Sequence, residues 1–427
     1  MALRRVIGFW EALAINLGAI VGAGIFVIRG IAAGIAGPSA IIAIAIGAVV
    51  SIFTGLSFAQ LSHAYSSEGG NYEYAKRQLG NYAGVVVGLM FILSSIVGGA
   101  VVALSFGSYF ASLAGSGIGA IAVAVLLIAC LGAVNYLGVK STALTSAALT
   151  VIKLAILAFF ILVGIFYIKP ANYVPFLPNG FGSLFEATAF IFFAYTGFAR
   201  VTTMGEEIRE PKKTIPRAII YSILISAIVY AVVMFVIIGL VPYGSLAASQ
   251  SPLAFAMLSA TGNREFEYVI SIGALFATVN VALSMILGVS RVAFAMSRDG
   301  NLPRSLSRLN RFGTPGMAII VPTLIMMLAA ATMDFRQIAS LSNAAALLSY
   351  SLANVAAIKL TIGRHSDPKK MFFRSRYFAA VPILGVASAA VLISFLTSLS
   401  LYLLLAILAA ITIYYIAAAR AKGPNRR

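Results

Sequence analysis

The chain has 427 residues, of which 61% are hydrophobic and only 10% are charged, and its mean hydropathy is +1.00. Soluble domains carry about 25% charged residues, so this composition excludes a soluble globular protein. The net charge of +18 would suggest a nucleic-acid partner for a soluble protein, but apolar runs of about twenty residues recur along the chain. The sequence therefore predicts an integral membrane protein with many spans, and we expect no nucleic-acid partner.

The apolar runs predict twelve spans. They cover residues 8–35, 39–65, 81–113, 117–137, 142–168, 183–207, 215–242, 266–297, 316–333, 337–361, 376–396 and 398–419. The first run is too long for a cleaved signal peptide and leads into further spans. The longest stretches outside the spans, 243–265, 298–315 and 362–375, are expected to be loops by their length and their turn residues. Residues 1–427 are thus expected to form one transmembrane domain whose functional groups lie within the bilayer.

Lysine and arginine are distributed unequally between the two sides. In this span assignment Arg29, Lys169, Arg264 and Arg336 fall on one side, and the other basic residues, apart from Lys153 inside a span, fall on the opposite side. Cytoplasmic segments carry the excess of Lys and Arg, so both termini are predicted to be cytoplasmic. We expect a multi-pass protein of the cell membrane whose basic face also attracts anionic lipid.

The residue types needed for metal or enzyme chemistry are scarce. Cys130 is the single cysteine, and His63 and His365 are the two histidines, so no metal site is expected. No set of paired acids or activated nucleophile appears in the spans. We therefore expect transport and not catalysis, and no cofactor.

The first span contains an unusual glycine cluster, LGAIVGAGIFVIRG at residues 17–30. Each glycine costs about 1 kcal/mol in a helix relative to alanine. Gly18 and Gly22 also fit the small-xxx-small spacing of close helix packing. Gly22 and Gly24 lie about 18–21 Å along the span from Trp10, close to the middle of a bilayer about 30 Å thick.

A second interruption is expected five spans later. The sixth span holds AYTGFAR, with Gly197 about 20 Å from the opposite face. Interrupted helices in corresponding positions are typical of transporters with inverted repeats. The predicted repeats are 8–168 and 183–361, followed by two additional helices in 376–419. An unwound first span presents amides near residues 23–25, which suit a carboxylate, while carbonyls near Ile20 and Thr196 suit an ammonium group.

Four segments resemble the amino acid–polyamine–organocation transporters in order and spacing. They are WEALAINLGAIVGAGIFVIRG, EGGNYEYAKRQLG, FIFFAYTGFARVTTMGEEIREPKKTIPRAII and SMILGVSRVAFAMSRDGNLP. The resemblance implies an all-α, LeuT-like fold with a five-plus-five inverted repeat and discontinuous first and sixth helices. It also implies that the amides of the first span contact a substrate carboxylate, that carbonyls receive its amino group, and that Phe193 forms an aromatic lid. The expected substrate-binding residues are Ile20, Gly22, Ala23, Gly24, Phe193, Thr196 and Gly197.

Lys153 lies about 16 Å into the fifth span, in TALTSAALTVIKLAILAFF. Ionised lysine is costly there, so intramembrane lysines usually face a cavity and are functional; the alternative of snorkelling finds no interface within reach. In proton-coupled or sodium-independent members of the family that the chain resembles, a lysine takes the place of a sodium ion beside the first span. The hypothesis is that Lys153 couples transport to protons by contacting carbonyls near Gly18 to Ile20.

Weaker signals surround this site. Glu206 and Glu207 are candidates for an inner gate with Arg209 or other basic residues, or else form a solvated helix end. Candidates for the side-chain pocket are Ser94, Ser95, Asn280, Ser284 and Asn343. Many members of the family carry a carboxylate after the Gly-Phe of the sixth span, whereas this chain has Ala199 and then Arg200, which makes a strongly cationic substrate less attractive.

The predicted function is secondary active, sodium-independent uptake of amino acids in symport with protons. An exchanger of amino acids or amines on the same fold is the nearest alternative. A membrane sensor that binds amino acids without transporting them is a further one.

Overall fold

A computed structural model of the chain describes residues 7–22, 24–65, 69–114, 119–138, 142–205, 207–249, 251–362 and 371–421. Two predicted site residues, Ala23 and Glu206, lie outside these ranges. Within them the chain is helical, and the extended pairing is limited to one isolated bridge between Ile7 and Ile208.

The first half of the chain contains seven α-helices and a short π-helical segment, η1. Their bounds are α1 Phe9–Ile20, η1 Gly24–Ile28, α2 Arg29–Ala36, α3 Ala40–Ala64, α4 Asn71–Leu79, α5 Asn81–Ala114, α6 Ala120–Leu137 and α7 Thr142–Gly164. The 3₁₀ turn Gly37–Ser39 separates α2 from α3, and Gly37 has the positive φ of 62° that favours glycine.

The second half continues in the same manner. Its elements are α8 Gly180–Tyr195, the 3₁₀ segment η5 Thr196–Met204, α9 Pro211–Leu240, α10 Tyr243–Ala248, α11 Pro252–Thr261, α12 Arg264–Arg298, α13 Gly316–Thr332, α14 Phe335–Ile362, α15 Ala380–Ser394 and α16 Ser398–Ala421. Ten helical segments of the described chain are long and apolar enough to cross a membrane, while α1, α11 and α13 are shorter apolar helices.

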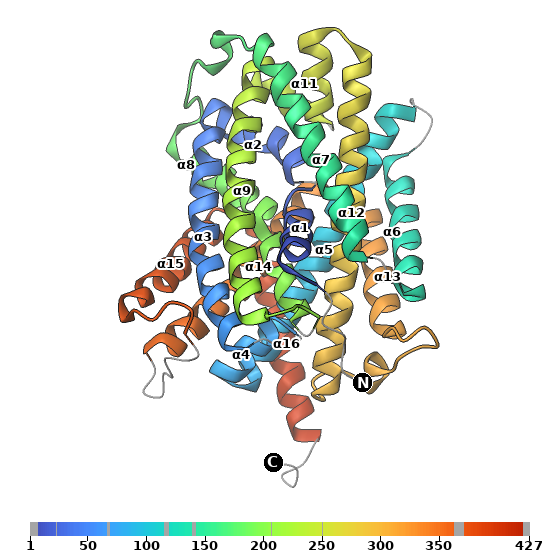
Figure 1. The fold of residues 1–427 in the computed structure, drawn as a ribbon, viewed down its shortest axis with the longest axis vertical. Helices are drawn as coiled ribbons and strands as arrows, with labels where there is room; N and C mark the ends of the chain where they lie inside the picture. The colour runs from blue at the N-terminus through green and yellow to red at the C-terminus, as the bar shows by residue number, and fades with distance from the viewer. Residues whose placement is uncertain are drawn as a thin grey trace.

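The helices form one bundle around α1 and α5. Figure 1 shows α1 near the middle, with α3 and α9 to one side, α12 to the other, and α6 and α15 at the periphery. The long helix α5 packs against α4, α6, α12, α13 and α14, and most of its side chains are buried. In contrast, most side chains of the spans formed by α6, α7 and α16 are only partly buried or exposed, as expected for helices that face lipid.

The prediction that residues 243–265 form a loop is wrong. This stretch contains α10 and α11, and Leu246, Leu253 and Met257 are fully buried. Pro252, which suggested a turn, occupies the first turn of α11, where its missing N–H costs no hydrogen bond. The two helices pack against α2, α9, α12 and η1. Length and turn residues misled the prediction because tertiary burial, not span-length hydropathy, stabilises these short helices.

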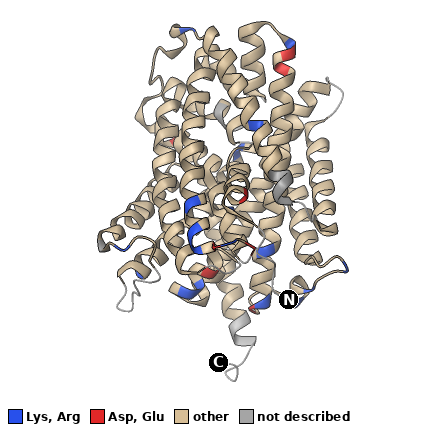
Figure 2. Ribbon diagram, viewed as in Figure 1, with Lys and Arg blue, Asp and Glu red and all other residues tan. Residues whose placement is uncertain are grey.

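Charged residues gather at one end of the bundle. Most described Lys and Arg residues lie in the lower half of Figure 2, toward the end of α16. There Asp299, which ends α12, accepts hydrogen bonds from Lys76 Nζ at 2.7 Å and from Tyr72 OH at 2.6 Å. Burial, and then the contact with Asp299, raises the pKa of Tyr72 well above its usual range. Tyr72 therefore stays a proton donor and fastens α4 to α12.

Candidate functional site

The first helix stops in the interior of the bundle. The last α-helical bond runs from Val21 N to Leu17 O at 2.8 Å, and Val21 itself is extended, with φ −75° and ψ 90°. The chain resumes as the π-helix η1, where Ile25 N donates to Gly22 O at 3.0 Å. The α-helix is therefore interrupted between Ile20 and Gly24, at the glycine cluster that the sequence singled out.

The sixth predicted span also changes its geometry at the expected place. The α-helix α8 ends at Tyr195 and continues as the tighter 3₁₀ segment η5, which begins at Thr196. The hydroxyl of Thr196 donates to Phe193 O at 2.8 Å. The change from α to 3₁₀ geometry alters which carbonyls in the turn Phe193–Thr196 are bonded within the helix.

The two interruptions touch each other. A Cβ on Gly197 would lie 2.4 Å from Ala19 O and 2.6 Å from Ile20 N. A Cβ on Gly24 would lie 2.5 Å from the Cα of Ala194. Real Cβ atoms do not approach a backbone this closely, so glycine is required at both crossings. The pairing that the sequence suggested from depth alone is therefore a direct backbone contact.

The hydroxyls of two buried tyrosines donate hydrogen bonds to carbonyls at the interruptions. Tyr230 OH, from α9, donates to Ile20 O at 2.7 Å and to Ala194 O at 3.1 Å. Tyr350 OH, from α14, donates to Thr196 O at 2.6 Å. The carbonyls of Ile20 and Thr196, which were expected to receive an amino group, are thus satisfied by hydroxyls in this conformation. Sequence reasoning missed both tyrosines; a polar hydroxyl within an apolar run was the available signal.

Lys153 lies where the sequence hypothesis placed it. It is fully buried, and its Nζ donates to Gly18 O at 2.7 Å. One turn earlier on α7, Thr150 Oγ1 donates to Ala14 O at 3.1 Å. These two bonds join α7 to the last turns of α1, and they place the lysine amine near the C-terminal end of a helix, where the helix dipole favours positive charge.

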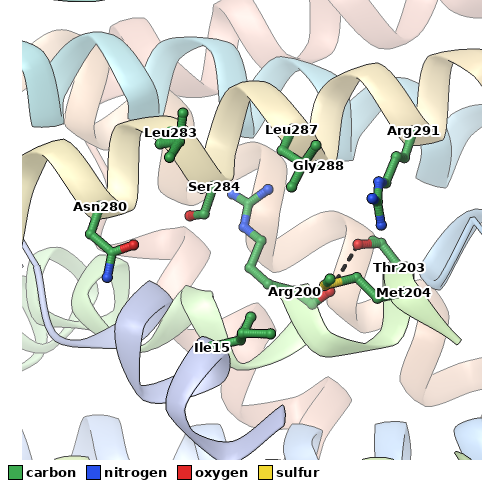
Figure 3. Close-up of a pocket in the computed structure, with 10 residues that line it drawn as sticks. All are labelled: Ile15, Arg200, Thr203, Met204, Asn280, Leu283, Ser284, Leu287, Gly288 and Arg291. Carbon is green, nitrogen blue, oxygen red and sulfur yellow. Dashed lines mark hydrogen bonds between the residues drawn. The ribbon is translucent and has the colours of Figure 1, made fainter. Parts of the chain in front are cut away.

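The candidate pocket residues fall into different places. Ser94 and Ser95 line a small cavity of about 10 Å³ together with Thr196. Asn280 and Ser284 line a second cavity of about 50 Å³ between α1, η5 and α12. The buried Asn343 donates instead to Ala189 O at 2.8 Å, a contact that joins α14 to α8. Figure 3 shows the second cavity, with Arg200 extending from η5 toward α12.

A contact between distant segments lies beside the second cavity, which Arg291 lines. Glu207 accepts a hydrogen bond from Arg291 Nη2 of α12 at 2.9 Å, and both side chains are largely buried. Ile7 N donates to Glu207 O at 3.1 Å, and Arg209 N donates to Ile7 O at 2.8 Å. The partner of Glu207 is therefore Arg291 on the eighth predicted span and not its neighbour Arg209. The other candidate gate residue, Glu206, lies outside the described residues.

Comparison with known proteins places the chain in a family. The family model described as amino acid permease matches residues 11–420. The chain belongs to the amino acid permease family.

Individual relatives of this permease carry transporter names. It is 32% identical over 381 residues to the branched-chain amino acid permease BcaP of Bacillus subtilis, covering 84% of this chain and 81% of that protein. It is 30% identical over 421 residues to the methylthioribose transporter of Bacillus subtilis, covering 93% and 89%. Identity to the inner membrane transport protein YbaT of Escherichia coli is 28% over 382 residues, covering 85% of both chains. The chain is thus a multi-pass membrane permease and not an enzyme.

Proposed function

We propose that this permease takes up amino acids across the cell membrane by alternating access, in symport with protons and without sodium. The observation that carries the proposal is the backbone contact of Gly197 with Ala19 and Ile20. It brings the carbonyl end of α1 and the start of η1 together with the carbonyls of the turn Phe193–Thr196. Amides and carbonyls at one point suit the carboxylate and ammonium groups of an α-amino acid.

The substrate-binding residues of this proposal are those expected from the sequence: Ile20, Gly22, Ala23, Gly24, Phe193, Thr196 and Gly197. For the substrate amino group to bind the carbonyls of Ile20 and Thr196, the hydroxyls of Tyr230 and Tyr350 must either release these carbonyls or share them. Sharing is possible because a carbonyl oxygen has two lone pairs. The name of the BcaP relatives makes branched-chain amino acids the first substrates to test.

The proposed architecture has twelve spans in a LeuT-like five-plus-five inverted repeat. The repeats comprise residues 8–168 and 183–361, and residues 376–419 form two additional helices within one domain, 1–427. Ten long apolar helices support ten spans. The ninth proposed span, α13, has 17 residues and a length of about 26 Å, while the first consists of α1, η1 and α2. The basic end of the bundle, with both termini, is proposed to face the cytoplasm.

Uptake into substrate-free proteoliposomes tests the proposal. Tritiated L-leucine, L-isoleucine and L-valine are expected to accumulate under an inward proton gradient and not under a sodium gradient alone. An exchanger would instead need amino acid inside the vesicles, and a sensor would bind without flux. If purified protein is stabilised against heat by amines or carboxylic acids but by no amino acid, the proposed head-group site is wrong.

A further inference from the structure

Arg200 is a buried cation without a counter-ion among the described residues. The residue is 8% exposed, and its Nη1 atom is buried with no hydrogen-bond partner in the described part of the chain. The guanidinium lies 5.0 Å from the centre of the Phe91 ring. It also fills the space beside Gly288, where a Cβ would lie 2.6 Å from Nη1. The packing therefore makes room for the guanidinium, while Nη1 has no acceptor among the described residues.

The two cavities of the site meet at this side chain. Arg200 lines the cavity of about 50 Å³ that contains Asn280 and Ser284. It also lines the cavity of about 10 Å³ that contains Ser94, Ser95 and Thr196. The side chains around both cavities include hydroxyls, an amide and the guanidinium of Arg291, and no aspartate or glutamate lines either one. In Figure 3 the guanidinium lies between Ser284 and Gly288.

An anion is the ligand that this arrangement suits. Burying an isolated charge is costly unless it is paired, and arginine stays charged at any physiological pH. Its planar fork of N–H donors matches a carboxylate in two parallel hydrogen bonds. One water molecule needs a cavity volume of about 10–15 Å³. The cavity of about 50 Å³ therefore has room for a carboxylate and a few further atoms.

The position of the cavity relates it to the substrate pathway. Its lining residue Ile15 precedes Ile20 by about 7 Å along α1, toward Phe9. Its lining residue Arg291 belongs to the ion pair with Glu207, farther from the helix interruptions on α12. A substrate that leaves the helix interruptions toward the basic end of the bundle therefore meets Arg200 before it meets the closed ion pair.

We propose that Arg200 forms a second carboxylate site, which holds the carboxylate of the transported substrate between the helix interruptions and the Glu207–Arg291 pair. This inference rests on the proposed function, since it assumes a substrate that carries a carboxylate. In the substrate-free protein the guanidinium is held ready by Phe91 and Gly288. The substrate carboxylate replaces the missing counter-ion during passage.

Heat unfolding of the full-length detergent-purified protein tests the site with 4-methylpentanoate, which has a carboxylate and no amine. Without an ammonium group this probe lacks half of the contacts at the helix interruptions, whereas Arg200 requires the carboxylate alone. We expect 4-methylpentanoate to raise the melting midpoint of the wild type and of Arg200→Lys. For the same rise in melting midpoint, Arg200→Gln is expected to need a concentration of 4-methylpentanoate at least about tenfold higher.

The controls separate this site from general effects. Arg217→Gln removes an exposed arginine near Trp10 and is expected to respond as the wild type does. Equal responses of Arg200→Gln and the wild type would overturn the proposal. The proposal would also be overturned if sodium chloride, added to an otherwise chloride-free buffer, raised the melting midpoint as much as 4-methylpentanoate does. The site would then take an inorganic anion.

A second measurement guards against a purely structural role. Without probe, Arg200→Gln is expected to melt at or above the wild-type midpoint, because it removes an unpaired buried charge. A large fall would mean that the cation already has a partner, which would overturn the proposal. The experiment is also separate from the test of the proposed function. If the wild type responds to 4-methylpentanoate but transports no amino acid, the carboxylate site at Arg200 is supported and the transport proposal is refuted.

Discussion

Lys153 joins two parts of the proposed mechanism at the scale of a single residue. Its Nζ reaches Gly18 O, two residues before α1 ends at Ile20. An ammonium group there stabilises the carbonyl end of α1, and a neutral amine does so less strongly. Protonation of Lys153 would therefore strengthen the end of the helix that borders the proposed substrate site, and we propose this as the physical basis of proton coupling.

Replacing Lys153 tests that coupling. Lys153→Ala is expected to abolish accumulation of tritiated L-leucine under an inward proton gradient, because the titrating group beside α1 is removed. Flux down an L-leucine gradient is expected to persist at a reduced rate, about tenfold lower for one lost charge-assisted hydrogen bond. Both are measured in proteoliposomes.

The matched control is Lys169→Ala, which removes an exposed lysine that follows α7. It should accumulate L-leucine as the wild type does. Proton-driven accumulation by Lys153→Ala, or sodium-driven uptake by the wild type, would refute the role of Lys153.

At the scale of elements, the site depends on two interrupted helices crossing without side chains between them. Gly197 and Gly24 provide the crossings, and the hydroxyl of Tyr230 binds a carbonyl from the last turn of each helix. One side chain on α9 thus links Ile20 and Ala194. Movement of either helix must change the hydrogen bonds of the other, so the two helices are suited to move in concert.

Adding one methyl group at the crossing tests its importance. Gly197→Ala would place Cβ 2.4 Å from Ala19 O, which is backbone and has little freedom to move. We expect a loss of about 1–3 kcal/mol in the free energy of unfolding and weaker L-leucine binding. Chemical denaturation in detergent and equilibrium binding measure the two effects.

The helix α8, which leads into η5, offers a matched control. Gly182 in α8 has open space where a Cβ would lie, so Gly182→Ala is expected to be neutral or to stabilise by about 0.5–1 kcal/mol. If Gly197→Ala behaves like Gly182→Ala, the two interruptions do not pack as closely as described.

At the scale of the whole molecule, one end of the bundle is closed by contacts between segments far apart in sequence. Ile7 pairs with Ile208 in an isolated bridge, and the neighbouring Glu207 forms an ion pair with Arg291 of α12. Arg291 of this ion pair also lines the cavity that contains Arg200 and Ser284. We therefore expect the ion pair to restrict access to the cavity from the basic end.

A charge exchange tests the closure. Ser284→Cys, in a background with Cys130→Ser, reports on access to the cavity through its rate of labelling by a hydrophilic thiol reagent. Glu207→Arg and Arg291→Glu are each expected to raise that rate several-fold, because each places like charges together. The coupling between paired charges is about 0.5–3 kcal/mol, so the double exchange should return the rate toward that of the wild type. Equal labelling rates in all four proteins would mean that the ion pair does not restrict access to the cavity.

The amino-acid sequence by itself determined that this chain is a membrane protein of many spans, that helices break at Gly22–Gly24 and near Thr196, and that Lys153 lies deep within a span. These features follow from local hydropathy and from backbone preferences, which are properties of short segments. The place of Lys153 beside the first break was implied only by the resemblance to the family. Only the tertiary structure decided that Gly197 touches Ala19, that Tyr230 joins both breaks, that Arg291 and not Arg209 pairs with Glu207, and that α10 and α11 are helices. Each of these depends on which distant surfaces pack together, and packing between segments leaves no periodic signal in either segment alone.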